Sequence, residues 1–352
     1  MTMMNSETLP EGLSIRSWEE GDDLRLLEIW GDPSSPQAHE ARTMLRENSN
    51  EPWARTLVVE DQGIPIAAGT IYESSLHPER NWIYVEVARE HRRQGIGTEL
   101  TRRLRAEAAA SSSQEVKTRF TFAAGTSADA NPAEAFTMAM GLNPIMRSRL
   151  VVVEPEALPL PVFDDNGLTL EEIATGSVEL TRVVADYYNA THDWDRSEMT
   201  LGRAQTMLLG DHTGAKGCIV LRDKPKAQGG RILTFAVSYE PARVDAPADV
   251  LIGWDPSLPD TDIRDSVRGL LAMLVHQYPV QLEVDDSMVP LADLVDALLV
   301  SGSATVIATT IIVASGVDPQ TGEPTAESSE EASEDGASTE SAETSAPSTE
   351  EL

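Results

Sequence analysis

The stretch REHRRQGIGTEL, residues 89–100, directly follows the apolar run NWIYVEVA of residues 81–88. The apolar run reads as a strand, and residues 96–110 have the composition of a helix that ends in alanines. Two arginines and two glycines, in the string RRQGIG, therefore stand where a strand passes into a helix. This arrangement predicts an α/β fold with a glycine-rich turn between the two elements.

A turn of this kind is suited to bind an anion. The first N–H groups of a helix have no internal partner, and the helix dipole places partial positive charge on them. Gly95 and Gly97 lack a Cβ, so a phosphate can approach the backbone closely. Arg92 and Arg93 add full positive charge beside it. We predict a phosphate site here, although the chain contains neither the GxGxxG string of dinucleotide-binding folds at its first strand nor the P-loop string GxxxxGK[ST].

The pattern VxVxxxxRRxGxG, from Val85 to Gly97, resembles the acetyl-CoA motif of the GNAT (Gcn5-related N-acetyltransferase) superfamily. The later string NPAEAFTMAMGL, residues 131–142, resembles the second CoA-contacting helix of that family. The resemblance implies that two splayed strands receive the pantetheine arm and that the loop amides hold the pyrophosphate. The cofactor-binding residues implied in this way are Val85, Glu86, Val87, Arg92, Arg93, Gln94, Gly95, Ile96, Gly97, Thr98 and Asn131.

The same resemblance implies candidate catalytic residues. Members of the family commonly use a tyrosine on the last helix to protonate the leaving thiolate, and the matching position here is Thr137. A threonine hydroxyl is a poorer acid, which leaves a bound water or the low pKa of the thiolate as alternatives. Glu86 is the candidate base, with Glu79 and His77 close by on the approach to the strand. No metal is expected.

The two halves of the chain repeat one order of elements. The first half predicts strand, two helices, three strands, helix, strand, helix and strand, at residues 13–18, 22–30, 39–48, 56–73 (two strands), 81–88, 96–110, 116–124, 131–140 and 147–154. The second half predicts nearly the same order, with its last elements at 249–255, 263–278, 280–284, within 287–300, and at 304–314. We interpret this as an internal duplication of one α/β unit with a mixed sheet.

The second unit has lost the residues that would hold a phosphate. Aligning Val87 with Trp254 places Pro259 and two aspartates, Asp260 and Asp262, where the first unit has its arginines and its first glycine. Proline removes an N–H donor, and aspartates repel a phosphate. We therefore expect a degenerate GNAT-like unit that supports the fold and shapes the acceptor cleft. Tandem units of this kind resemble the two-domain acetyltransferases of actinobacteria, mycothiol synthase included.

Composition changes define the expected domain boundaries. The proline-rich stretch at 155–167 separates a domain at 1–154 from a degenerate domain at 168–316. Residues 317–352 contain about eleven acidic residues and neither lysine nor arginine, the signature of a disordered acidic tail. This composition favours the interpretation that the tail keeps the protein soluble over the alternative that it binds a partner.

The composition of all 352 residues excludes several classes of partner. The net charge of −31 argues against nucleic acid and anionic membranes as partners. The sequence shows neither a signal peptide nor an apolar run long enough to span a bilayer, so we expect a cytoplasmic protein. The single cysteine, Cys218, lies in an apolar run and is expected to be a buried structural residue.

The sequence thus predicts an enzyme, an acetyl-CoA-dependent N-acyltransferase acting on an amine of a small molecule or peptide. The alternative is a non-catalytic acyl-CoA-binding or sensing protein, which the absence of the tyrosine at Thr137 favours. A mycothiol synthase-like enzyme and an acidic scaffold that acts through its tail are further alternatives. The protein is expected to be a monomer or a homodimer.

Overall fold

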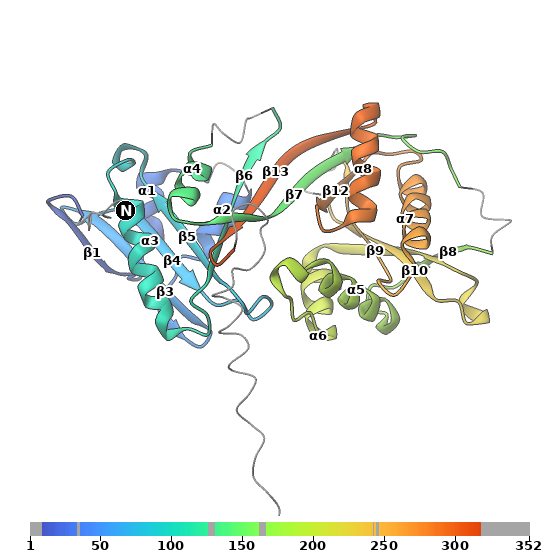
Figure 1. Ribbon diagram of the computed structural model, residues 1–352, viewed down its shortest axis with the longest axis horizontal. Helices are drawn as coiled ribbons and strands as arrows, with labels where there is room; N and C mark the ends of the chain where they lie inside the picture. The colour runs from blue at the N-terminus through green and yellow to red at the C-terminus, as the bar shows by residue number, and fades with distance from the viewer. Residues whose placement is uncertain are drawn as a thin grey trace, which may run out of the picture.

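The computed structural model describes residues 9–33, 36–125, 131–161, 167–241, 243 and 246–317. It shows an α/β protein built on one mixed sheet, as Figure 1 illustrates, and this confirms the predicted fold class. The acidic tail expected at 317–352 lies outside the described residues from 318 onward, as does the 162–166 part of the expected linker. Within the described ranges, every helix is too short or too polar to cross a bilayer.

The first half follows the predicted order of elements, with one short strand, β2, added. Its elements are β1 (Leu13–Ser17), α1 (Asp22–Trp30), α2 (Pro36–Thr43), β2 (Ser49–Asn50), β3 (Trp53–Asp61), β4 (Ile64–Tyr72), β5 (Asn81–Val87), α3 (Ile96–Glu107), β6 (Val116–Ala123), α4 (Pro132–Ala139) and β7 (Asn143–Val153). The second helix lies earlier than the 39–48 expected from sequence. It ends because the N–H groups of Met44 and Leu45 bond to carbonyls only three residues back, a tightening typical of a helix end.

The second half repeats this order, as the predicted duplication requires. Its elements are β8 (Thr169–Ile173), α5 (Val178–Thr191), α6 (Leu201–Ala204), β9 (Ala215–Arg222), β10 (Ile232–Tyr239), β11 (Ala248–Trp254), α7 (Asp260–Leu274), β12 (Val280–Asp285), α8 (Val289–Ser301) and β13 (Ala304–Ala314). The ends of β5 and β11 fall at Val87 and Trp254, the two residues aligned from sequence.

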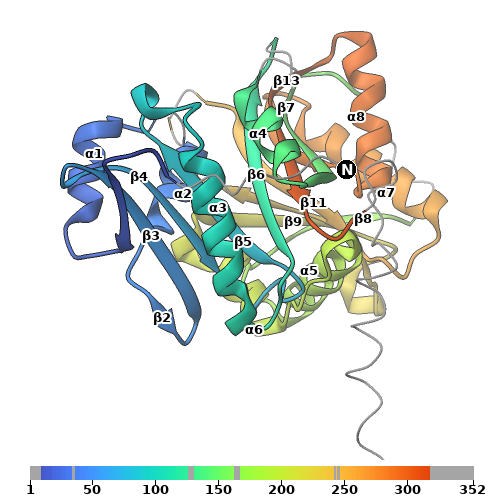
Figure 2. The same ribbon diagram turned by 60° about the vertical axis from the view of Figure 1, so that its left-hand side comes forward.

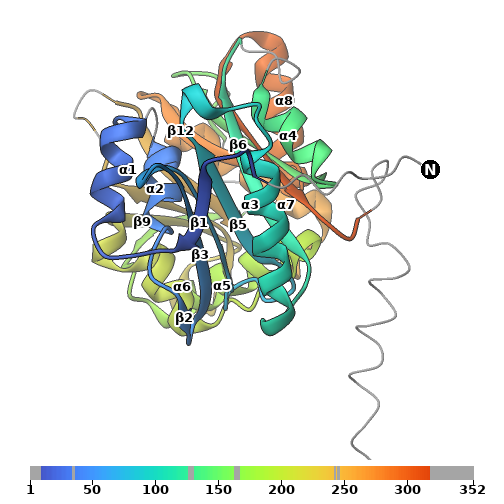
Figure 3. The same cartoon turned by 90° about the vertical axis from the view of Figure 1, so that its left-hand side faces the viewer.

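Helices cover both faces of the sheet in the first half. Figure 3 shows α1 and α2 on one face and α3 and α4 on the other. The alternation of β3 produces this arrangement, because Val58 packs in a cluster with Leu26 of α1, and Val59 in a cluster with Leu100 of α3. These side chains are fully or almost fully buried, so both helix layers are fixed by hydrophobic contact.

The two halves exchange their last strands. The order across the sheet is β1-β3-β4-β5-β6-β13-β7-β12-β11-β10-β9-β8. The last strand of the second half, β13, therefore pairs with β6 of the first half, and β7 of the first half pairs with β12 of the second. β13 and β7 also pair with each other along their whole length, and Figures 1 and 2 show the two strands running together between the halves. The hydrophobic core of each half is consequently completed by the other.

The neighbouring strands β5 and β6 of the first half separate soon after they begin. β5 and β6 are parallel, and their paired register is limited to Asn81 with Val116 and Trp82 with Lys117. In the second half, β11 and β12 pair only from Ala248 to Val250. Both halves therefore have the splayed pair of strands expected from the GNAT resemblance.

Aromatic side chains fill the core beneath α5 in the second half. Gly253 of β11 stands at the position of Glu86, and the Phe235 ring of β10 lies directly over it. Tyr187 of α5 packs edge-on against Phe235 and against Trp254, with ring centroids 5.5 and 4.8 Å apart. These aromatic rings stabilise the core beneath α5.

The substitution Gly253→Ala tests this packing. An added Cβ would lie 2.3 Å from Cζ of the fully buried Phe235 and 2.9 Å from Cδ1 of Tyr187, so the rings would have to shift. We expect a loss of about 1–3 kcal/mol in the free energy of unfolding, measured by denaturant titration. The matched control is Gly217→Ala on β9, whose added Cβ meets nothing within 4 Å. Equal effects of the two substitutions would contradict the packing described.

Candidate functional site

The loop between β5 and α3 has an unusual backbone. Arg93 has φ +65° and Gly95 has φ +80°, so two residues close in sequence adopt the left-handed conformation. For a non-glycine residue such a conformation is uncommon and concentrates at functional sites. The first hydrogen bond of α3 runs from the Glu99 N–H to the Gly95 carbonyl, at 3.0 Å. The amides of residues 96–98 therefore point out of the helix end, toward the loop.

Gly97 lies in close contact with its surroundings. A Cβ at this position would lie 3.2 Å from the Phe136 ring of α4 and 3.7 Å from Val87 of β5. The start of α3 is therefore held against both α4 and the end of β5. This brings the two predicted CoA-contacting segments, at 92–98 and at 131–142, to one end of the splayed strands.

The free edge of β5 presents its main chain toward β6. The Ala88 N–H donates to the Ile66 carbonyl at 2.8 Å, which makes residues 66 and 88 a hydrogen-bonded pair of the β4–β5 ladder. Because pairs alternate in an antiparallel ladder, the main-chain groups of Val85 and Val87 point away from β4 and those of Glu86 point toward it. Arg92 Nε donates to the outward Val87 carbonyl at 2.9 Å, which places the guanidinium at this edge.

Asn131 begins α4, as predicted. Its Oδ1 accepts the Ala133 N–H at 3.0 Å and so caps the helix. Gly141, with φ +70°, follows the helix as the predicted terminating glycine. The cap leaves the Asn131 side-chain amide as the group that a ligand would meet.

Glu86 lies in an ion pair that the sequence analysis did not foresee. Arg42 of α2 donates to both carboxylate oxygens, at 2.8 and 2.7 Å, and Tyr84 Oη donates to Oε2 at 2.5 Å. Burial and the neighbouring carboxylate raise the pKa of Tyr84 well above its usual range. The hydrogen bond to Glu86 raises the pKa of Arg42. Glu86 therefore ties α2 to β5, and its role as a base stays a prediction.

Thr137 is buried inside the helix layer. Its hydroxyl donates to the Glu134 carbonyl at 3.0 Å, and its own carbonyl accepts the Leu142 N–H. The hydroxyl proton is thus engaged within α4 in this structure. The role of Thr137 as an acid also stays a prediction.

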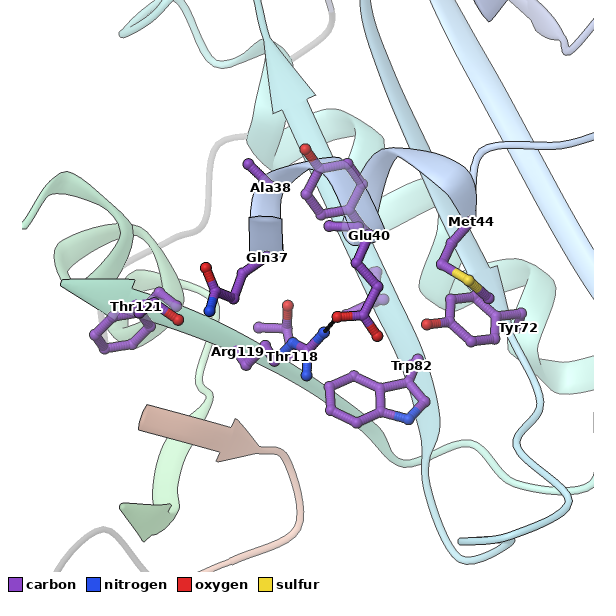
Figure 4. A pocket seen from close by; sticks show the side chains of 13 residues that line it. Gln37, Ala38, Glu40, Met44, Tyr72, Trp82, Thr118, Arg119 and Thr121 are labelled. Atoms are coloured by element: carbon purple, nitrogen blue, oxygen red, sulfur yellow. Dashed lines mark hydrogen bonds and ion pairs between the residues drawn. The ribbon is translucent and has the colours of Figure 1, made fainter. Parts of the chain in front are cut away.

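A cleft opens where β5 and β6 part, on the face covered by α2. It has a volume of about 380 Å³ and is lined by Glu40 of α2, Met44 just after α2, Tyr72 of β4, Trp82 and Tyr84 of β5, and Arg119 of β6, among others. We call it the α2 cleft. Figure 4 shows the Arg119 guanidinium and the Glu40 carboxylate meeting across it, 2.7 Å apart, with the Trp82 ring close by.

The ion pair across the α2 cleft can be separated at little cost. The Glu40 side chain is 65% exposed and that of Arg119 is 37% exposed. An exposed pair of this kind contributes at most about 1 kcal/mol, so an entering ligand can displace it. In the wall of the cleft Tyr72 is half-buried, and burial raises the pKa of its hydroxyl to about 12. The cleft therefore combines aromatic walls with one separable pair of opposite charges.

The side chains of β5 beside the gap alternate between the two faces of the sheet. Val85 and Val87 pack in the cluster that contains Ile96 and Leu100 of α3, whereas Trp82 and Tyr84 face the α2 cleft. The loop amides and the α2 cleft thus lie at opposite faces of the same gap. Within the described residues, His, Cys, Asp and Glu side chains form no group of three or more suited to hold a metal ion.

The corresponding loop of the second half differs in length and chemistry. Eight residues, 88–95, separate β5 from α3, whereas five residues, 255–259, separate β11 from α7. The residue before α7 is Pro259, which therefore takes the place of Gly95, so the residue-by-residue alignment made from sequence beyond Trp254 is wrong by three positions. Asp260 and Asp262 lie in the first turn of α7, where they would repel an anion.

Comparison with known proteins agrees with this geometry. Residues 16–141 match the model of the acetyltransferase (GNAT) family, which confirms the resemblance stated from sequence. A search of curated proteins found no match.

Solved structures extend the likeness to both halves. A GCN5-related N-acetyltransferase from Sphaerobacter thermophilus is 15% identical with a TM-score of 0.53, covering 87% of this chain and 96% of that one. A tandem GNAT protein from the clavulanic acid biosynthesis pathway is 15% identical with a TM-score of 0.55, covering 86% of this chain and 98% of that one. A glucosamine N-acetyltransferase region of a fungal multi-domain GH3 β-N-acetylglucosaminidase is 12% identical with a TM-score of 0.57, and the match covers 87% of this chain and 38% of that one. At these identities the likeness concerns the fold alone.

Proposed function

We propose that this protein is an N-acetyltransferase that transfers the acetyl group of acetyl-CoA to an amine, because residues 16–141 match the acetyltransferase (GNAT) family. The acceptor is an amine of a small molecule or a peptide. The observation that carries the proposal is the set of outward-pointing amides at the start of α3, at the end of a gap between two parting strands.

The loop residues bind the cofactor in this proposal. The amides of residues 93–98 hold the pyrophosphate, assisted by the helix dipole and by Arg92 and Arg93. The pantetheine arm lies along the outward main chain of Val85 and Val87, displacing the Arg92 side chain from the Val87 carbonyl. The side-chain amide of Asn131 donates to the arm from the opposite side.

The chemistry takes place in the gap between β5 and β6. The acceptor nitrogen attacks the carbonyl carbon of the thioester, and the carbon–sulfur bond breaks to give the amide and a thiolate. A cationic acceptor first loses one proton to become a nucleophilic amine, the amine nitrogen loses a second proton as the amide forms, and the thiolate takes up one, with water as the carrier where no side chain is free. The α2 cleft delivers the amine, and its aromatic walls with the exposed Glu40 carboxylate suit a group that is cationic before it reacts.

A non-catalytic acyl-CoA-binding protein is the second candidate. It is favoured by the state of the two candidate catalytic groups, since Glu86 has both oxygens bonded and the Thr137 hydroxyl proton is engaged. Such a protein would bind CoA without turnover.

One assay separates the two candidates. The protein is incubated with acetyl-CoA and a panel of small amines and peptides, and free CoA is measured with a thiol reagent. An enzyme releases CoA in an amine-dependent way, and Arg93→Glu abolishes the release. Tight CoA binding by calorimetry without release on any amine would instead establish the binding protein.

The substitution Glu86→Gln tests the role of that residue. As placed, the Glu86 carboxylate anchors Arg42 in a largely buried pair, so we expect the substitution to lower the free energy of unfolding by about 1–3 kcal/mol. We expect kcat to change by less than about tenfold. A fall in kcat of more than about 100-fold at unchanged CoA affinity would instead assign Glu86 as the general base.

A further inference from the structure

A buried group of charges joins the two halves beside the α2 cleft. Asp195 of the second half lies in the short turn that follows α5 and is 1% exposed. Its carboxylate pairs with Lys117 of β6 through Oδ2 and with Arg80 through Oδ1, the latter at 2.9 Å. Lys117 is also 1% exposed and Arg80 is 8% exposed. One carboxylate of the second half thus balances two buried cations of the first.

These charges contact the wall of the α2 cleft through Lys117. The Lys117 Nζ lies 4.7 Å from the centroid of the Trp82 ring, within the range of a cation–π contact. Lys117 and Trp82 are also the last paired residues of β5 and β6 before the strands part. The ammonium therefore holds the Trp82 ring at the point where the cleft begins.

The loop that leads into β5 is fixed by the same surface of the second half. His77 bonds through Nδ1 to the Asp195 carbonyl at 2.7 Å and through Nε2 to Tyr188 Oη at 3.0 Å. The Glu198 N–H donates to the Leu76 carbonyl at 2.8 Å, and Leu76 packs on the core of the second half. Burial lowers the pKa of His77, which therefore stays neutral in this contact at neutral pH.

Asp195 is needed to keep Lys117 charged. Burial lowers the pKa of Lys117, and the charge of Asp195 opposes that effect. Without the carboxylate, two buried cations would lack their partner. The Lys117 side chain would then either lose its proton or move toward solvent. In either case the contact between the ammonium and the Trp82 ring would be lost.

We propose that the second half completes the acceptor site of the first, with Asp195 as a positioning residue that fixes Lys117 and, through it, Trp82. This inference rests on the proposed function, in which the α2 cleft binds the amine. The degenerate half then contributes to acceptor recognition, in addition to supplying strand β13 to the sheet of the first half. Asp195 itself touches neither acceptor nor cofactor.

The test uses the full-length protein and two substitutions. Asp195→Asn removes the carboxylate charge, and Lys117→Met removes the ammonium while leaving Asp195 paired with Arg80. Lys117→Met therefore keeps the proposal testable where Asp195→Asn fails to fold. The control is Glu179→Gln, which weakens the pairing of another fully buried cation, Arg222, within the second half.

Two readouts separate positioning from general destabilisation. The first is the fluorine NMR signal of Trp82 in protein labelled with 5-fluorotryptophan, assigned with Trp82→Phe. We expect Asp195→Asn and Lys117→Met to shift or broaden this signal and Glu179→Gln to leave it unchanged. The second is steady-state kinetics, in which both substitutions raise the KM for the amine about tenfold or more while the CoA affinity stays the same.

Each result decides a different claim. An unchanged Trp82 signal in both variants would overturn the proposal, and so would a shifted signal with an unchanged amine KM. Wild-type protein that binds CoA and acetylates no amine would overturn the proposed function instead. In that case the fluorine signal would still decide whether Asp195 fixes Trp82.

Discussion

Val313→Asp is expected to unfold the first half of the protein, although Val313 belongs to the last strand of the second half. Val313 is 2% exposed and packs in one cluster with Val116, Phe120 and Leu142 of the first half. An unpaired carboxylate in this cluster is expected to cost about 4 kcal/mol or more in the free energy of unfolding. Denaturant unfolding measures the loss, and CoA binding should fall with it, because β6 forms one side of the proposed CoA site.

Ile307→Asp provides the matched control on the same strand. Ile307 is 42% exposed, so the same new charge stays in contact with water, and we expect a change within about 1 kcal/mol. Equal effects of the two substitutions would contradict the strand exchange between the halves. So would an unaltered CoA affinity in a Val313→Asp protein whose second half had unfolded.

Arg93→Glu is expected to weaken acetyl-CoA binding by about 100-fold or more. A charge-assisted hydrogen bond to a phosphate contributes about 1.5–3 kcal/mol, and the new carboxylate adds repulsion beside the pyrophosphate. Arg93 is exposed, so the substitution should leave the fold intact. Calorimetric titration with acetyl-CoA measures the affinity, and circular dichroism confirms the fold.

Arg264→Glu is the control for the change in charge. Arg264 lies in the first turns of α7, the helix of the second half that corresponds to α3, and pairs with Asp293 on the surface. The substitution changes the net charge by the same amount at the equivalent helix, and we expect an unchanged CoA affinity. A loss similar to that of Arg93→Glu would mean that overall charge, and not the loop at 92–98, controls binding.

The order of elements and the loop at 92–98 were predictable from sequence. Alternation and apolar runs mark strands, and the string RRQGIG marks a helix start with outward amides. The fold of both halves followed from the repetition of that order. The left-handed backbone at Gly95 was also foreseeable, because glycine adopts it without strain.

The exchange of strands was not predictable from the same signals. Val313 and Val151 are both buried, and burial indicates that a strand lies inside a sheet without naming its neighbour. The paired residues of these two strands are 151 to 171 positions apart in sequence, from Ala304 with Val153 to Ala314 with Asn143, so their register depends on tertiary packing alone. From sequence alone, each half is accordingly expected to form a unit with its own last strand.

The long-range ion pairs were missed for a related reason. Glu86 pairs with Arg42 across 44 residues, and Lys117 pairs with Asp195 across 78 residues. In sequence, each of these side chains reads as one more exposed charge on a strand or loop. The only available signal was local, since Lys117 alternates with apolar neighbours in the string VKTRF and so shares one face of β6 with Arg119.

Calorimetric titration of the wild-type protein with acetyl-CoA tests the central claim most directly. The first half has the outward amides, glycines and arginines of a CoA site, and the second has Pro259 and two aspartates at the equivalent helix start. We therefore predict a stoichiometry of one acetyl-CoA per chain. Two molecules per chain, or none, would contradict the assignment of a single acyl-CoA site to the loop at 92–98.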